Sequence, residues 1–163
     1  MFSRGEVRAD NVLHCDVGGA TCYLFDYTYV RRKRRRKRTH AQGTYSCFKL
    51  HERRLPIFQI RHANKGRKAD AIVFDSHPEF GNHYVVTGED EVAVREVVSN
   101  ELLDYLQRQG DAAWAVEGSG EWLGIALRPT VSLRRHINPE DMRQIRDDVL
   151  RIYKGLVVQE VQV

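Results

Sequence analysis

No stretch of this sequence is apolar enough to cross a membrane. A transmembrane helix needs about 20 consecutive apolar residues, and the 163 residues contain no such run. The amino-terminal segment from Met1 to Glu6 also lacks the apolar core of a secretory signal peptide. We therefore expect a protein of the cytoplasm or of the cytosolic face of a membrane.

The chain has only three cysteines, and their spacing matches no metal-binding or redox motif. Cys15, Cys22 and Cys47 form no CxxC pair, and their odd number leaves one thiol over in any disulfide scheme. This argues against a disulfide-stapled fold. We expect the three cysteines to be small core residues within strands.

The signatures of nucleotide cofactors and of nucleophilic catalysis are missing as well. Neither GxGxxG nor a Walker A sequence occurs. Gly118-Ser119-Gly120 is not a GxSxG elbow, because no strand-to-helix context follows it. We expect no cofactor, assign no catalytic residue and favour a binding protein over an enzyme.

What the sequence does contain is enough apolar material for one folded domain over residues 1–163. Hydrophobic residues make up 42% of the chain, which excludes overall disorder, and 29% charged residues keep the surface polar. A chain of this length can bury a core without disulfides or metals.

Runs of β-branched and aromatic residues separated by turn residues predict strands. Their expected positions are 11–17, 21–30, 39–50, 56–61, 71–74, 83–87, 113–117 and 122–128, the last two joined by a tight turn at 118–120. Thr87 with Asp90, and then Ser99, begin two short helices or one kinked helix that ends at Gly110. A last helix begins at Asn138-Pro139 and ends near Lys154-Gly155, followed by a short strand or a tail.

This order predicts an α+β fold. We expect a mostly antiparallel, curled sheet of about seven strands, with the two short middle helices and the C-terminal helix covering one face. A pleckstrin-homology-like barrel capped by its last helix is one version of this arrangement, by analogy with the order of strands and helices.

One segment departs far from average composition, a run of eight consecutive basic residues between two predicted strands. Its members are Arg31, Arg32, Lys33, Arg34, Arg35, Arg36, Lys37 and Arg38. The chain has 26 basic and 22 acidic residues, a net charge of +4, and without the run 18 basic residues would face 22 acidic ones, a net of −4. The positive charge therefore belongs to one hairpin tip.

The basic run has two candidate partners and one interpretation without a partner. An anionic membrane surface would attract it, and nucleic acid would bind it in a salt-dependent, sequence-independent way, helped by stacking on Tyr27, Tyr29 or Tyr45. The third interpretation is a solvated loop, since eight like charges cannot pack in a core.

Two other clusters carry chemistry-bearing side chains. Pro78 and Gly81 predict a turn over the segment 75–83. The segment contains His77, Glu79 and His83, which are weak metal-ligand candidates of a metal-dependent enzyme, although their spacing matches no metal motif. His40, Cys47 and His51 could share one face but lack a fourth ligand. Finally, Glu117, Glu121, Trp114 and Trp122 surround the 118–120 turn and could line a groove, although tryptophans in strands are usually core residues.

Several short motifs in order resemble a family of uncharacterised bacterial proteins, commonly tethered by membrane helices. They are Asn11-Val12-Leu13, Phe25-Asp26-Tyr27-Thr28-Tyr29, Leu55-Pro56-Ile57-Phe58, Phe74 to Phe80, Tyr84 to Gly88 before Ala93-Val94-Arg95, and Val116 to Leu123. The resemblance implies a non-catalytic, membrane-associated binding or scaffold module and brings no functional residues with it. Because this chain has no membrane span, it implies a soluble member or a piece of a longer protein.

Overall fold

The computed structural model describes residues 5–32, 38–63, 70–110, 114–127 and 139–157. Its strands are β1 (Gly5–Val17), β2 (Ala20–Arg32), β3 (Arg38–Leu50), β4 (Leu55–His62), β5 (Tyr84–Gly88), β6 (Trp114–Gly120) and β7 (Trp122–Leu127). Its helices are α1 (Phe80–His83), α2 (Glu91–Val97), α3 (Asn100–Arg108) and α4 (Pro139–Val157). None of these helices is long and apolar enough to span a bilayer.

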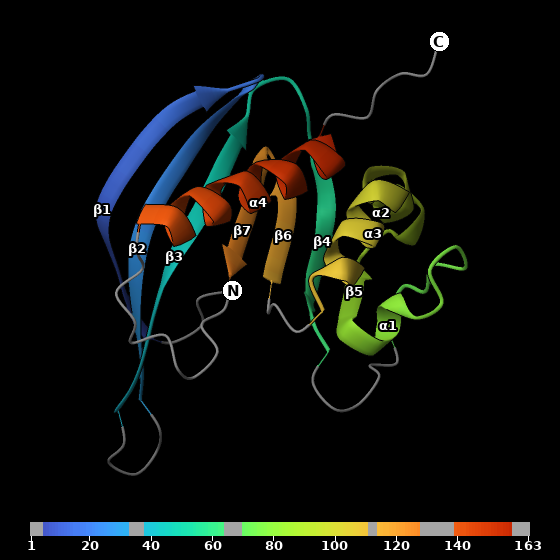
Figure 1. Ribbon diagram of the computed structural model, residues 1–163, viewed down its shortest axis with the longest axis horizontal. Helices are drawn as coiled ribbons and strands as arrows, with labels where there is room; N and C mark the ends of the chain where they lie inside the picture. Colours follow the sequence, from blue (N-terminus) through green and yellow to red (C-terminus); the bar gives the residue numbers. More distant parts are fainter. Residues whose placement is uncertain (1–4, 33–37, 64–69, 111–113, 128–138, 158–163) are drawn as a thin grey trace.

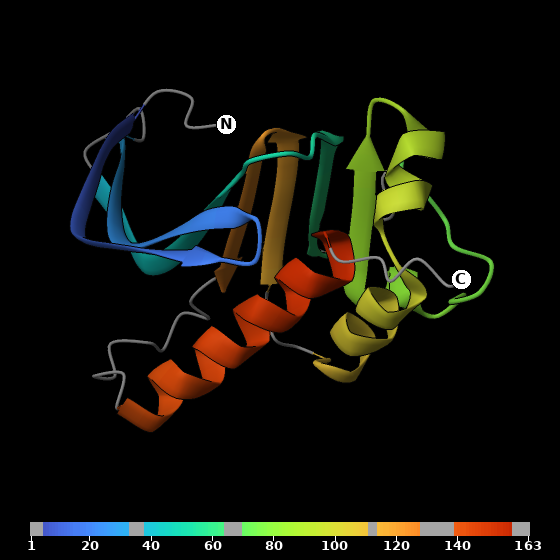
Figure 2. The same ribbon diagram turned by 90° about the horizontal axis from the view of Figure 1, so that it is seen from above.

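The seven strands form one antiparallel sheet in the order β1-β2-β3-β7-β6-β4-β5. The sheet curls at the β1–β3 end, and α4 crosses one of its faces (Figures 1 and 2). The predicted α+β class is therefore confirmed. The barrel version is not, because within the described residues no pairing joins the two edge strands β1 and β5 and the sheet stays open.

The core lies between the sheet and α4. Phe48 of β3 stacks on Tyr153 of α4 with ring centroids 4.5 Å apart, and Ile152 and Leu156 are fully buried beside them. The Tyr153 hydroxyl donates to the carbonyl of Gly18 at 2.9 Å, which ties α4 to the turn between β1 and β2. Alternate residues of β3, β6 and β7 point into this core, as the period of two in a strand requires.

Helix α4 continues to Val157, beyond the predicted end near Gly155. Gly155 lies inside the helix, where a Cβ atom would be 3.0 Å from Leu102 Cβ of α3. The glycine thus permits a close crossing of α3 and α4 instead of ending the helix. Arg53 closes the true end by donating to the carbonyl of Val157.

Three further expectations were wrong. Residues 71–74 form no strand, because Ile72 alone bridges to Val86 while its neighbour Val73 stays exposed. Residues 80–83, predicted as part of a turn, form the single helical turn α1, which buries Phe80. Cys15 is exposed rather than a core residue, since β1 lies at the sheet edge.

The middle helices match the sequence signals in part. Ser99 accepts from the Leu102 amide at 3.2 Å and begins α3 as expected. Helix α2 begins later than the Thr87 signal indicated, because Thr87 belongs to β5 and the Asp90 side chain accepts from the Ala93 amide at 3.1 Å. They are separate helices, because Val98 between them is extended.

Candidate functional site

The basic run lies at the end of the β2–β3 hairpin. Arg31 pairs with Thr39 and Arg32 with Arg38, so the predicted hairpin is confirmed for the backbone. Residues 33–37 lie outside the described part of the chain, as do the side chains of 27–44, including Tyr27 and Tyr29. The pairing of β3 with β7 covers only Tyr45 to Lys49, so the distal half of the hairpin extends past β7 with β1 beside it (Figure 1).

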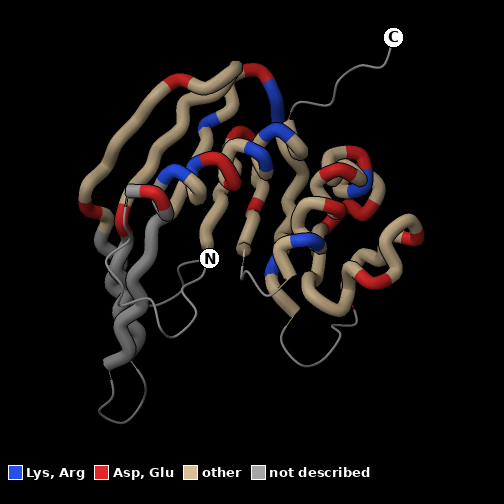
Figure 3. Tube along the Cα trace, viewed as in Figure 1, with Lys and Arg blue, Asp and Glu red and all other residues tan. Residues whose placement is uncertain are grey.

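Acidic residues gather at the opposite edge of the sheet. The segment 70–110, which contains α1, β5, α2 and α3, has nine acidic residues and two basic ones. Figure 3 shows these acidic positions around the helices beyond β4, far from the β2–β3 hairpin. The acidic segment 70–110 therefore lies at the β5 edge of the sheet, away from the β2–β3 hairpin.

The sheet face opposite α4 carries a hollow. No described helix lies over this face of β3, β7 and β6 (Figure 2). The hollow has a volume of about 520 Å³, within the range of ligand sites. We call it the sheet groove, and its lining includes Tyr45, Ile57, Gln59, Asp70, Glu89, Glu117, Ser119 and Trp122.

The shape of the sheet groove depends on two glycines. Gly124 of β7 lets the Tyr45 side chain lie flat across the strand, since a Cβ atom there would be 2.8 Å from the Tyr45 ring carbon Cζ. Gly118 of β6 makes room for the Phe58 ring in the same way. Small residues in these strands thus accommodate large neighbouring rings.

Polar and aromatic groups line the sheet groove. The Gln59 amide donates to Glu117 Oε1 at 2.6 Å, which fixes that carboxylate against β4. Trp122 is 42% exposed, lies 6.4 Å from the Tyr23 ring, and has the Lys49 ammonium 5.7 Å from its own ring. The face therefore offers carboxylates beside exposed aromatic surface.

Of the four residues expected to line a groove near the 118–120 turn, Glu117 and Trp122 do so. Trp114 does not, since its side chain is only 2% exposed and belongs to the core. Glu121 instead lies 3.9 Å from Lys49 at the surface. The sequence missed Asp70 and Glu89. Glu89 follows β5, which pairs with β4, and Asp70 lies just before Ile72, which bridges to Val86 of β5.

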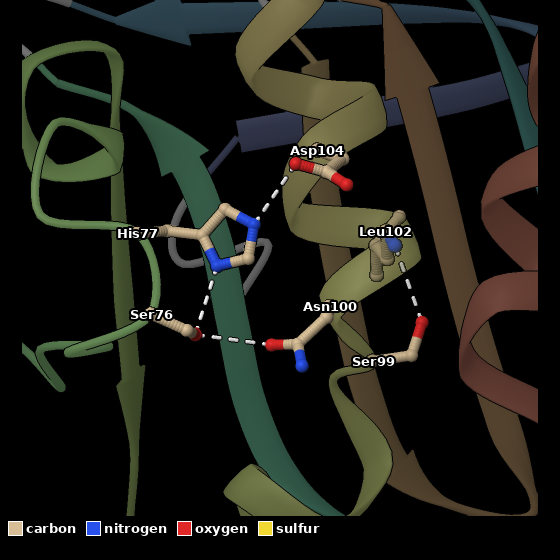
Figure 4. Close-up of polar contacts among 6 residues, drawn as sticks. All are labelled: Ser76, His77, Ser99, Asn100, Leu102 and Asp104. Carbon is tan, nitrogen blue, oxygen red and sulfur yellow. Dashed lines mark hydrogen bonds and ion pairs between the residues drawn. The ribbon is translucent and has the colours of Figure 1, made fainter.

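The 75–83 segment is held to α3 by a polar cluster (Figure 4). His77 contacts Ser76 Oγ through Nδ1 at 2.9 Å and Asp104 Oδ1 through Nε2 at 3.0 Å, and Ser76 also donates to Asn100. This places a hydroxyl and a carboxylate on the two ring nitrogens of one histidine. The hollow beside His77 measures about 20 Å³, room for one water, and Ser76 does not line it. The cluster thus fastens a loop to a helix.

The proposed metal ligands do not converge. Among the described residues, no three His, Cys, Asp or Glu side chains are placed to hold a metal ion. His77, Glu79 and His83 therefore do not form a group of metal ligands. His51 contacts Thr21 at 3.0 Å, and the side chain of His40 lies outside the described residues.

The half-buried thiols are poor ligands and nucleophiles. Burial raises the pKa of Cys47, and burial followed by the neighbouring Cys15 and Cys47 raises the pKa of Cys22 to about 11. Both thiols are protonated at neutral pH, whereas metal binding and nucleophilic attack need the thiolate.

Comparison with known proteins finds a similar arrangement of strands and helices and no similar sequence family. No protein-family model matches the chain, and no curated protein sequence does. The crystal structure of the mycobacterial trehalose monomycolate transport factor A, TtfA, is similar with a TM-score of 0.60 and 15% identity, over 96% of this chain and 76% of that one. At this identity the likeness concerns the arrangement of the strands and helices.

Proposed function

We propose that this chain is a non-catalytic binding module of a membrane-associated protein, and that its basic run contacts an anionic lipid surface. The observation that supports this most is the backbone pairing of Arg32 with Arg38, because it holds both ends of the run at the far end of an extended hairpin. A flat, charged surface can meet such a tip without meeting the rest of the sheet.

The charge distribution favours a defined orientation. Each basic residue near an anionic leaflet contributes about 1 kcal/mol, so the run can hold a domain of this size at the surface. The segment 70–110, with nine acidic and two basic residues, would be repelled and would face away. The structural similarity to a protein named as a transport factor also fits a binding role better than a catalytic one.

The test compares two variants of equal net charge on lipid vesicles. R34S/R35S/R36S and K65S/R67S/K68S each remove three positive charges, the first from the run and the second from another basic segment. Co-sedimentation with phosphatidylcholine vesicles containing phosphatidylserine should weaken roughly a hundredfold for the first variant, since three contacts of about 1 kcal/mol are lost. The second variant should bind nearly as the wild type does.

Pure phosphatidylcholine vesicles serve as the neutral control and should retain neither protein. Equal binding of wild type and R34S/R35S/R36S to the anionic vesicles would refute the lipid contact. Retention on DNA or RNA that exceeds vesicle binding, and that falls steeply with salt, would support the nucleic-acid alternative instead.

A further inference from the structure

The sheet groove has the chemistry of a site for a cation. Its described lining contains the carboxylates of Asp70, Glu89 and Glu117 and no lysine or arginine. Asp70 and Glu89 are exposed at the rim, and neither forms an ion pair with another described residue. A cationic group would replace part of its hydration there with carboxylate contacts.

Aromatic rings in the lining of the sheet groove also favour a cationic ligand. A guanidinium or ammonium group is attracted to the face of a tryptophan or tyrosine. Trp122 and Tyr45 both line the groove, and Trp122 already has the Lys49 ammonium 5.7 Å from its ring centre. Arginine suits such a site better than lysine, because its planar group stacks on rings and pairs with carboxylates through two hydrogen bonds.

The chain itself carries the matching ligand, the run from Arg31 to Arg38. Within one molecule, β3 leads away from the groove toward Arg38. Arg38 is seven residues from Tyr45 along β3, which is roughly 23 Å at about 3.3 Å per residue. An arginine side chain spans less than half of that distance, which favours a second molecule as the source of the run.

We infer that the sheet groove binds the basic run of a second copy of this chain. The basic end of one molecule meets the acidic, aromatic face of the next, so each molecule offers one run and one groove. Such a head-to-tail contact either closes into a ring or continues as a chain of molecules. The run is then shielded in the assembly, and an anionic surface would compete with the groove for it.

The contact should depend steeply on salt. The attraction between a run of eight positive charges and three carboxylates acts over about 10 Å at 0.1 M salt and about 3 Å at 1 M. Sedimentation velocity or light scattering of the full chain should therefore show concentration-dependent association at low salt and monomers at 1 M salt. Monomers at all concentrations in low salt would overturn the inference.

Two complementary variants test which surfaces meet. The loop variant R34S/R35S/R36S keeps an intact groove, and the groove variant D70N/E89Q/E117Q keeps an intact run. Each alone should remain monomeric, whereas a mixture should form one-to-one pairs, because one partner supplies the run and the other the groove. A mixture that stays monomeric would overturn the head-to-tail contact.

Matched controls separate this contact from general charge effects. K65S/R67S/K68S has the net charge of the loop variant, and D75N/E79Q/E101Q has that of the groove variant. Both controls should associate as the wild type does. If they lose association equally, net charge and not the groove is responsible, and the inference fails.

A peptide with the sequence RRKRRRKR provides a direct probe. Titrated onto the loop variant, it should bind at low salt and not at 1 M salt. Adding D70N/E89Q/E117Q to the loop variant should weaken binding roughly a hundredfold, at about fivefold for each carboxylate. Unchanged peptide affinity would overturn the site. Vesicle binding by the groove variant, whose run is intact, reports the lipid contact separately.

Discussion

Replacing Gly118 with alanine should destabilise the protein through one identifiable clash. Gly118 of β6 is paired with Phe58 of β4, and a Cβ atom on it would lie against the Phe58 ring, 2.7 Å from Cδ1. Phe58 is only 3% exposed, so its ring cannot turn out into water. The added methyl group must displace a packed ring.

The expected magnitude follows from two opposing effects. Inserting a methyl group into a packed core costs about 1–3 kcal/mol, and replacing glycine by alanine returns about 0.4–1 kcal/mol by restricting the unfolded chain. The free energy of unfolding of G118A should therefore fall by about 1–2 kcal/mol. Urea denaturation followed by circular dichroism measures it, with S119A, an exposed neighbour on β6, as the control.

A double mutant decides whether the clash is the cause. F58L alone should cost about 1 kcal/mol through lost packing, but it also opens the space that the new methyl group needs. G118A/F58L should therefore be about as stable as F58L. If the two losses simply add, the Phe58 ring is not what excludes a side chain at position 118, and the reasoning fails.

Two more outcomes follow from polar contacts in the helices. D90A and S99A should each lower the free energy of unfolding by about 1 kcal/mol, because each removes a side chain that accepts from a backbone amide at the start of a helix. The conservative variants D90N and S99T should restore most of the loss. An unchanged free energy of unfolding in the alanine variants would contradict the capping role. Burial, and then the hydrogen bond to Asp148, raise the pKa of Tyr105 above its usual value of 10.0. Below pH 10 the Tyr105 hydroxyl is protonated in folded and unfolded chains alike, whereas above pH 10 the unfolded chain releases the proton first. The free energy of unfolding should therefore fall with rising pH in the wild type and fall less in Y105F. Equal slopes of the two proteins in urea denaturation at several pH values would contradict this.

The sequence predicted most elements of the fold because their signals are local. Alternating apolar residues mark β2, β3 and β4, and Ser99 marks the start of α3 where the structure has it. Gly155 was misinterpreted because a glycine that ends a helix and one that lets two helices cross look the same in sequence. Only the position of Leu102 opposite Gly155 separates the two cases.

The sheet groove could be predicted only in part. Glu117 and Trp122 adjoin one tight turn, so their proximity is visible in the sequence. Asp70 and Glu89 join them because β4 lies between β6 and β5, a strand order that involves neighbours distant in the chain. Nothing local specifies that order, since it depends on how the whole sheet packs under α4.

The tie between α4 and the first turn has a consequence for the order in which the protein can fold. The Tyr153 hydroxyl bonds to the Gly18 carbonyl, 135 residues earlier, and Arg53 bonds to Val157. A chain emerging from the ribosome can pair β1, β2 and β3 early, but their buried face stays uncovered until the last helix has been made. The nascent protein therefore exposes apolar sheet from the synthesis of β3 until α4 has been made, and this is the period in which a chaperone would matter most.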